Sequence, residues 1–580
     1  MTRSIVEDTV ESLRSFGNRP AVESDGAAVT YRQLADDVDR LARWLCPQPA
    51  LAGRRPALIT SSHTPRTVAA ILACVRACVT YVPVPADTPE SRLTHIREAV
   101  DAGVHLRDTN GDITVQSLDT VGRDSDERDD IALAVLHTSG STGAPKSVVI
   151  EHRNLDHFLR WCRHALPLTD TDRLALLSPL HFDLCTHDIY HGLASGATLI
   201  MPDEFERTNA QAAARFIVER GATVLYMVPT FLERVATAVT RSVGRAVDVR
   251  TVMFAGERLS ARGRTAVEAA FPNARLHNLY GPIETNVITA RELLRGRAND
   301  SSDVGQALPG VGLRIRTADG SITEAGRGEL VVSGTAVTPG YLDSHHNIGK
   351  FVTAPTGDRF YRTGDEATLS AAGVHLHGRL DNMVKLRGQR IELDEVEAVI
   401  AELEHVAQSA VIVGASADAL EAYVVLSDAD HERPTSEEPV IGGPITAHCR
   451  ARLPEVAVPA HVFVIDGMPI TATGKIDRRS LREHRLRTAL PVPSGVNNSS
   501  EPTDPVHAIE EFLADHLGNT PAQLRALPVL REHPAFNSVV AAQCIEAVED
   551  RLGCSADYDR LTGHSFDTIT SMGELFDHHS

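Results

Sequence analysis

Residues 131–152 combine the residue types that bind phosphate groups. The segment IALAVLHTSGSTGAPKSVVIEH gives an apolar strand, a loop rich in threonine, serine and glycine, a lysine and a second apolar run. Glycine lets the backbone approach a ligand closely, hydroxyl groups hydrogen-bond phosphate oxygens, and Lys146 adds positive charge. A Walker A loop needs glycine directly before its lysine, and Pro145 stands there instead. The pattern predicts a phosphate site outside the P-loop class, with a plain surface turn as the alternative.

Charged residues recur in four later segments that could complete such a site. These segments are YGPIETN (280–286), YRTGD (361–365), GRLDNMVKLRGQRIELDEVE (378–397) and PITATGKIDR (469–478). Taken singly, Glu284, Asp365 and Lys475 would be solvated surface charges, because charged side chains are rarely buried. The order of the segments along the chain is more informative than any one of these residues.

With the phosphate loop, these segments resemble the signature motifs of the adenylate-forming superfamily. That superfamily contains acyl-CoA synthetases, luciferases and the adenylation domains of nonribosomal peptide synthetases. Further similar motifs stand in the family's order at 29–45, 77–93 and 326–343. The resemblance covers about residues 20–485. Ser147 departs from the glycine that usually follows the loop lysine, which affects the expected mobility of the loop and not the assignment.

The resemblance implies an ATP-dependent ligase. A substrate carboxylate would attack the α-phosphorus of ATP and expel pyrophosphate, a step that needs metal and positive donors around the phosphate oxygens. Glu284 would help to hold Mg²⁺, Thr285 would contact the α-phosphate, and Lys475 would bridge the substrate carboxylate and the phosphate oxygens. The residues implied to bind the nucleotide are Thr138, Ser139, Gly140, Ser141, Thr142, Gly143, Lys146, Tyr280, Asp365 and Arg379.

Two further roles follow from the same resemblance. Asp365 would accept both ribose hydroxyls, with Arg379 nearby and Tyr280 packed near the adenine. Asp381 corresponds to the hinge between a large and a small subdomain, and a hinge is a few residues that absorb a large backbone change. The small subdomain would rotate after adenylation, withdrawing Lys475 and bringing the loop at 388–390 in for thioester formation.

The segment SPLHFDLCTHDIYHGL (178–193) places Asp183 directly after an aromatic residue. Amino-acid-activating members of the family have an aspartate here that pairs with the α-ammonium group of the substrate, a charge-assisted contact. Acyl-CoA synthetases for fatty or aryl acids generally lack it. Asp183 therefore favours an α-amino acid as the substrate, and the alternative is an aspartate that caps backbone amides at a helix start.

Alignment by motif with the family predicts a substrate pocket. Its residues are Asp183, Leu184, His187, Tyr226, Met253, Ala255, Leu279, Val287 and Ile288, with Lys475 closing the set. This set is similar to the pocket of stand-alone proline-activating domains, although His187, Met253 and Ile288 depart from that pattern. His187 departs most, and it would mean a polar-substituted or larger cyclic substrate, or a ring turned outward. We predict proline or a proline-like cyclic amino acid first, and another small-to-medium aliphatic amino acid second.

Two serines near the C-terminus could carry 4'-phosphopantetheine. Ser565, in GHSF, resembles a carrier motif, but only 15 residues follow it, too few for two further helices at about 1.5 Å per residue. Ser538, in AFNSVVAAQCIEAVEDRLG, precedes a well-patterned helix and resembles carrier proteins, with Asn537 in place of the usual aspartate. We predict phosphopantetheine on Ser538, attached by a phosphopantetheinyl transferase. The alternative is an inert helical interaction domain.

The sequence contains no HHxxxDG condensation motif and no GxSxG thioesterase motif. The loaded residue is therefore expected to pass to a downstream condensation or tailoring enzyme in natural-product biosynthesis, and a small activator protein is a further candidate partner. Ligation to free coenzyme A is the rival reaction, which the fused carrier and Asp183 disfavour. A non-catalytic nucleotide-binding scaffold is the other rival.

Positioning these residues requires a mostly parallel α/β domain. Apolar strands alternate with a helical pattern through 55–61, 67–77 and 79–86, and the alternation recurs later in the chain. Ligands bind at the carboxyl ends of such strands. We expect a large N-terminal subdomain of mixed sheets and helices, a small α+β subdomain, a linker and a helical-bundle carrier domain, at 1–380, 381–487, 488–504 and 505–580.

Bulk properties exclude several classes of function. The net charge of −20 over 580 residues argues against nucleic acid as the main partner, because phosphate backbones bind basic patches. The N-terminus lacks the apolar run of a signal peptide, and no stretch approaches the roughly 20 apolar residues that span a bilayer. The eight cysteines show no CxxC pair and no His/Cys cluster at zinc spacing, which predicts free thiols in a reducing compartment. We expect a cytoplasmic protein without a membrane partner.

Overall fold

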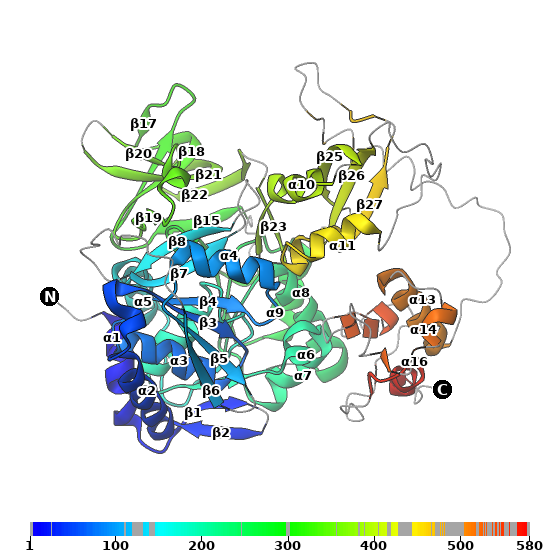
Figure 1. The fold of residues 1–580 in the computed structure, drawn as a ribbon. Coiled ribbons are helices and arrows are strands. Elements are labelled where there is room, and N and C mark those ends of the chain that lie inside the picture. The colour runs from blue at the N-terminus through cyan, green and yellow to red at the C-terminus, as the bar shows by residue number, and fades with distance from the viewer. Residues whose placement is uncertain are drawn as a thin grey trace. The chain divides into compact units, whose positions relative to one another are not determined.

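The computed structural model describes most of the chain (Figure 1). The described residues are 4–118 without 25, 110 and 111; 132–138; 145–296 without 245 and 247; 302–426 without 355, 356, 381, 382, 388, 404 and 415–418; 443–469 without 466; 476, 478, 481; 504–517; and a subset of 521–576. They form two compact units. The first takes in Met1–Ser139, Pro145–Asp203 and Ala214–Gly388, and the second takes in Glu204–Ala213 and Gln389–Ser580.

A 15-stranded mixed sheet is the largest element of the first unit. Its order is β17-β16-β18-β21-β22-β15-β14-β13-β12-β11-β9-β10-β1-β2, and β20 pairs with β21. Its strands are β1 (Pro20–Ser24), β2 (Ala27–Thr30), β9 (Arg173–Ala175), β10 (Thr198–Met201), β11 (Val224–Met227), β12 (Thr251–Ala255), β13 (Arg275–Tyr280), β14 (Thr289–Leu293), β15 (Asp303–Ala307), β16 (Val311–Arg316), β17 (Ile322–Thr323), β18 (Gly326–Gly334), β20 (Phe351–Thr353), β21 (Arg359–Ser370) and β22 (Gly373–Arg379).

A second sheet of the same unit has seven strands in the order β19-β8-β7-β4-β3-β5-β6. Strands β7, β4, β3 and β5 run parallel. Strands β8 and β6 are antiparallel to their neighbours β7 and β5, and β19 pairs antiparallel with β8 at the edge. The strands are β3 (Ala57–Ser61), β4 (Tyr81–Pro85), β5 (Val104–Thr109), β6 (Asp112–Ser117), β7 (Ala132–Thr138), β8 (Lys146–Glu151) and β19 (Gly340–Tyr341).

Helices connect the strands along the chain, and Glu204–Ala213 within them belongs to the second unit. They are α1 (Ile5–Ser12), α2 (Tyr31–Leu45), α3 (Pro65–Arg76), α4 (Glu90–Val100), α5 (His152–Ala165), α6 (Glu204–Thr208), α7 (Ala210–Glu219), α8 (Pro229–Ala238) and α9 (Ala261–Ala270), with short turns η1 (Leu13–Phe16), η2 (Pro49–Arg54), η3 (His187–Gly192), η4 (Val239–Val243) and η5 (Ser344–Asn347). The alternation of strands and helices predicted from the sequence is confirmed.

The start of α3 shows how local sequence sets these elements. Thr64 caps the helix by accepting a hydrogen bond from the Thr67 amide, and Pro65 occupies the first helical position, where its missing N–H costs nothing. The apolar residues that follow are fully buried, because α3 packs against α2 and against strands β3, β4 and β5. The helix that the sequence predicts at 67–77 is therefore a core element.

The parallel strands β9, β11, β12 and β13 bring their carboxyl ends to one edge of the large sheet. Tyr226 lies opposite Met253 across β11 and β12, and Ala255 lies opposite Leu279 across β12 and β13. This arrangement places four residues of the predicted pocket on three neighbouring strands. It is the edge at which α/β sheets bind ligands.

The second unit begins after β23 (Met383–Leu386), the last strand of the first unit. Its first part holds β24 (Gln389–Glu392), α10 (Leu393–Ala401), β25 (Val406–Val413), β26 (Leu420–Leu426), α11 (Pro444–Arg450), η6 (Glu455–Ala457) and β27 (His461–Val464). Strands β25, β26 and β27 form one sheet, and α10 packs on β25. This is the small α+β unit expected from the sequence.

The described part of the C-terminal region is helical. It contains α13 (Pro505–Leu517), α14 (Pro521–Arg525), α16 (Ile569–Gly573) and the turn η9 (Glu574–Phe576). Ile509, Leu513, Cys544 and Ile545 are buried in its core. A bundle carrier domain remains a prediction for this region. Within the residues that the structure describes, no helix is both long and apolar enough to cross a membrane.

Candidate active site

The strands on either side of the predicted phosphate loop, β7 and β8, are neighbours in the seven-stranded sheet. Thr138 at the end of β7 lies directly opposite Lys146 at the start of β8. Lys146 is buried, and the buried Thr138 hydroxyl has no hydrogen-bond partner among the described residues. A buried hydroxyl that has no partner and stands beside a buried lysine fits a phosphate ligand, which would satisfy the hydroxyl. Ser139, Gly140, Ser141, Thr142 and Gly143 lie outside the described residues.

At the predicted ribose site, Asp365 accepts hydrogen bonds from two other side chains, Arg379 and Tyr280. Strands β21 and β22 pair Asp365 with Arg379, and the Arg379 guanidinium donates to Asp365 Oδ1 at 3.0 Å. The Tyr280 hydroxyl, at the end of β13, donates to Asp365 Oδ2 at 2.6 Å. Burial and the nearby Asp365 carboxylate raise the pKa of Tyr280 well above its ordinary value, so it stays a donor. A carboxylate oxygen has two lone pairs, so Asp365 can still accept from a ligand.

The turn after Tyr280 carries Glu284 and Thr285, and both are fully buried. The backbone of this turn is so tight that a Cβ on Gly281 would lie 1.8 Å from the Asn286 carbonyl oxygen. Only glycine fits at this position. Glu284 Oε1 accepts from the Tyr341 hydroxyl at 2.5 Å. A buried carboxylate supplies the hard oxygen that Mg²⁺ prefers, so Glu284 fits that cation. Sequence reasoning missed Tyr341, although it stands in the GYLD segment of a family motif.

The Thr285 hydroxyl is engaged with the backbone of its own turn. It lies 3.1 Å from both the Pro282 and the Asn286 carbonyl oxygens. Contact with a phosphate would require the hydroxyl to rotate away from these acceptors. The structure therefore places Thr285 beside Glu284 as predicted, but with its hydroxyl bound internally.

Three other predicted site residues, Lys475, Asp381 and Ser538, lie outside the described residues. The segment that carries Lys475 is nevertheless anchored three residues later. Arg478 donates to both carboxylate oxygens of Glu397 on α10, at 2.7 and 2.9 Å. This two-point contact fixes the end of the GKIDR segment to the small α+β unit.

Asp183, which the sequence predicts to pair with the α-ammonium group of the substrate, is half-buried. Burial raises the pKa of its carboxyl to about 6, against the opposing effect of the Lys385 ammonium. The Asp183 charge in turn contributes to the raised pKa of Tyr226, which places the carboxylate near that phenol. A carboxylate whose ionised form is disfavoured by burial gains most from a cationic partner.

The walls of this pocket are apolar. Tyr226, Met253, Ala255, Leu279 and Val287 belong to one buried cluster, and Leu184 packs against it. Ile288, which the sequence assigns to the same pocket, is buried in a different cluster with Tyr280, Val304 and Leu313. Six of the predicted pocket residues therefore belong to or border one buried cluster, and Ile288 lies in another.

His187 is fully buried, so its ring is not turned out into solvent. Its ring stands edge-on to Tyr226, with centroids 5.9 Å apart. Nδ1 lies 2.8 Å from Asp188 Oδ1, and Nε2 lies 3.2 Å from His191 Nδ1. Burial lowers the pKa of His187 to about 3, so the ring is neutral. Both ring nitrogens are engaged inside the protein.

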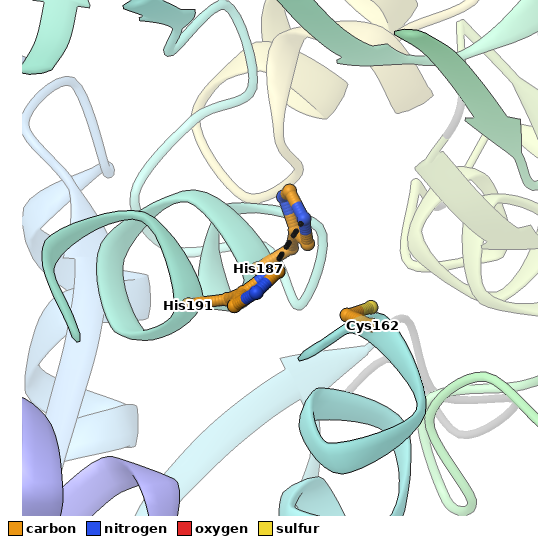
Figure 2. Close-up of side chains that lie close together, drawn as sticks. All are labelled: Cys162, His187 and His191. Carbon is orange, nitrogen blue, oxygen red and sulfur yellow. Dashed lines mark hydrogen bonds between the residues drawn. The ribbon is translucent and has the colours of Figure 1, made fainter. Parts of the chain in front are cut away.

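Figure 2 shows a cluster that sequence spacing did not reveal. The helix α5 brings Cys162 to His187 and His191 of η3, and all three side chains are buried. The sequence shows no zinc-type spacing here because Cys162 and the two histidines lie in different segments of the chain. Asp188 and His191, which were not predicted, are recognisable in the sequence only as the polar residues of an otherwise apolar helical turn.

In the C-terminal region the structure describes Ser565 but not Ser538. Ser565 is buried, with 5% of its surface exposed. A modifying enzyme needs access to the hydroxyl, so the burial of Ser565 argues against it as the site of attachment.

Two parts of the chain match models of one protein family. Residues 10–342 match the model described as AMP-binding enzyme, and residues 395–475 match its C-terminal domain. D-alanine–D-alanyl carrier protein ligase of Bacillus cereus (strain AH187) is 30% identical over 78% of this chain and 94% of that protein. Surfactin synthase subunit 2 of Bacillus subtilis is 29% identical over 83% of this chain, which spans 14% of that longer protein.

Solved structures share the fold. The adenylation domain AlmE of Vibrio cholerae, in complex with glycyl-adenosine-5'-phosphate, has a TM-score of 0.72 at 23% identity, over 84% of this chain and 98% of that one. PA1221, a protein with adenylation and PCP domains, has a TM-score of 0.73 at 21% identity, over 100% of this chain and 97% of that one. Together with the family match and the assembled motifs, these likenesses lead to one conclusion: the chain belongs to the AMP-binding enzyme family and is an adenylate-forming ligase, an enzyme class that uses ATP and Mg²⁺.

Proposed function

We propose that the protein activates an amino acid as its aminoacyl-adenylate and loads it as a thioester onto a phosphopantetheine arm on Ser538. The observation that carries the first half is Asp183, a half-buried carboxylate near Tyr226 of the apolar cluster that holds the predicted pocket residues. A fatty or aryl acid offers nothing to pair with that charge, whereas the α-ammonium group of an amino acid does. The relatives named for D-alanyl carrier protein ligation and the complex of AlmE with a glycyl-adenylate support the same class of acid.

In the first half-reaction, a carboxylate oxygen of the amino acid bonds to the α-phosphorus and the bond to the bridging oxygen of pyrophosphate breaks. Lys146, Thr138 and the loop between them would bind the phosphates, and Asp365 would hold the ribose. Glu284 would hold Mg²⁺, which supplies positive charge to the phosphate oxygens when bound. Lys475 would stabilise the charge that develops between the carboxylate and the α-phosphate.

In the second half-reaction, Ser538 would hold the phosphopantetheine arm, whose thiol would accept the aminoacyl group from the adenylate with AMP as the leaving group. The buried position of Ser565 and the helix that follows Ser538 in the sequence support Ser538 as the attachment site. The likeness to PA1221, which contains adenylation and PCP domains, supports a fused carrier over residues 505–580. The donor of the arm would be a phosphopantetheinyl transferase, and a condensation or tailoring enzyme would receive the product.

The pocket supports an apolar side chain on the substrate. Its walls are aliphatic, apart from Tyr226 and the edge of His187, and both nitrogens of His187 are already engaged by Asp188 and His191. A polar substituent on the substrate would therefore compete with existing hydrogen bonds. On the similarity of the pocket residues, we place proline or a proline-like cyclic amino acid first and another small-to-medium aliphatic amino acid second. The relatives named as D-alanine ligases support the second candidate.

ATP–pyrophosphate exchange with a panel of amino acids tests the substrate. We expect the strongest exchange with proline or a small aliphatic amino acid. A clear preference for an acidic or aromatic amino acid, or for a carboxylic acid without an amino group, would refute the pocket assignment.

Intact-mass analysis tests the carrier. After coexpression with a phosphopantetheinyl transferase, the protein should gain the mass of one phosphopantetheine, and ATP with the amino acid should then add one aminoacyl group. Ser538→Ala should abolish both additions, and Ser565→Ala is the matched control that keeps them. If product forms only with added coenzyme A, the enzyme is an acyl-CoA-type ligase.

A further inference from the structure

The cluster of Cys162, His187 and His191 has the composition of a metal site. One sulfur and two imidazole nitrogens lie within 4.8 Å of one another, and none of the three side chains is more than 1% exposed. Cys162 comes from α5, whereas both histidines project from η3, a π-helical turn (Figure 2). π-Helical turns occur often at functional sites.

The spacing of the donor atoms suits a tetrahedral cation. With metal–nitrogen bonds of about 2.0–2.1 Å, two nitrogens of a tetrahedral zinc site lie about 3.3 Å apart. His187 Nε2 and His191 Nδ1 are 3.2 Å apart. A thiolate bond of about 2.3 Å puts sulfur about 3.6 Å from each nitrogen. Because the ligand atoms already lie within 4.8 Å of one another, Cys162 Sγ needs a shift of about 1.2 Å at most.

Asp188 supplies the outer contact that metal-bound histidines usually have. Its Oδ1 lies 2.8 Å from His187 Nδ1, so a proton on that nitrogen is held by the carboxylate and the lone pair of Nε2 is left for the cluster. The second oxygen, Oδ2, is buried and has no hydrogen-bond partner among the described residues.

We propose that Cys162, His187 and His191 bind a zinc-type divalent cation beside the amino-acid pocket. Binding displaces the thiol proton to solvent and leaves the fourth coordination position to a water or ligand donor. His187 belongs to the predicted pocket wall, so the cation would fix the orientation of that wall. The proposal does not depend on which amino acid is activated.

Metal analysis of the full-length protein tests the site. Protein expressed with added zinc should contain one equivalent more zinc per chain than Cys162→Ser and His191→Gln proteins prepared alongside. Cys449→Ser, which alters a buried cysteine in α11 of the second unit, should keep the wild-type content. Replacement of zinc by Co²⁺ should give a thiolate-to-cobalt charge-transfer band that Cys162→Ser lacks and Cys449→Ser keeps.

Asp188→Asn should weaken the affinity for the cation about 10- to 100-fold, because the outer contact orients the ligand. Competition with a chromogenic zinc chelator measures this change. Wild-type protein that holds no zinc and gives no cobalt band would overturn the proposal. So would a zinc content that is equal in wild type and Cys162→Ser, because surface histidines would then account for it.

Discussion

Asp183 combines a functional charge with an environment that disfavours it. Its pKa of about 6 lies above the ordinary value of 3.8 because the carboxyl is buried. Pairing with a substrate ammonium would recover the energy that burial removes. The same residue should therefore control both substrate affinity and stability, in opposite directions.

The affinity effect is measurable as a pH profile. Because the ionised form of Asp183 binds the ammonium group, kcat/KM for the amino acid should fall about tenfold per pH unit below pH 6. Asp183→Asn should lower kcat/KM roughly 10- to 100-fold at pH 8 and flatten this limb of the profile. A variant with an unchanged limb would assign the ionisation to another group.

The stability effect has the opposite sign. The folded-state pKa of Asp183 is raised, so the folded protein binds more protons than the unfolded chain between pH 4 and 6, and stability falls as the pH rises through this window. At pH 8 the free energy of unfolding of Asp183→Asn, measured by urea denaturation, should exceed that of wild type by about 2 kcal/mol. Near pH 4 the two values should be equal. Equal stability at both pH values would show that the carboxyl is not perturbed in the empty site.

At the scale of elements, the turn between β13 and β14 positions Glu284 and Thr285. Gly281→Ala would bring a methyl group onto the Asn286 carbonyl and shift the turn. We expect a loss of about 2–3 kcal/mol in the free energy of unfolding together with weak adenylate formation. Gly467→Ala is the matched control, since a Cβ there meets nothing within 4 Å. Urea unfolding and pyrophosphate exchange measure the two effects.

The contact between Arg478 and Glu397 gives a second element-scale prediction. If it positions the segment that carries Lys475, Glu397→Gln should slow adenylate formation about tenfold and leave transfer from a supplied adenylate nearly unchanged. Lys475→Ala should show the same division more strongly. Equal loss of both half-reactions in both variants would contradict a role confined to adenylation.

The elements were largely predictable because their signals are local. Apolar periodicity and the cap of α3 lie within a few residues, and family motifs located Asp365 and Glu284. Contacts that join distant segments gave no such signal. Neither Tyr341 beside Glu284 nor Cys162 beside His187 shows any spacing in the sequence that would pair them. The burial of His187 was likewise not predictable from its residue type, because it results from the packing of η3 in the core.

At the scale of the whole molecule, the fused carrier predicts intramolecular loading. Enzyme and acceptor on one chain meet at an effective concentration set by the linker and not by the protein concentration. The rate of aminoacylation per chain should therefore stay constant when holo-protein is diluted. A rate that falls in proportion to concentration would mean that one chain loads another. Mixing Ser538→Ala chains with Lys475→Ala holo-chains isolates that second route.

The packing of His187 against Asp188 and His191 also bears on how the specificity of this enzyme could change. A pocket residue that stands alone can be exchanged one step at a time. Here His187 is hydrogen-bonded to both Asp188 and His191. Removing any one of these three side chains therefore leaves another buried and unsatisfied. Substitutions at these positions should be strongly epistatic, and a route to a new substrate would pass through His187 only when its partners change with it.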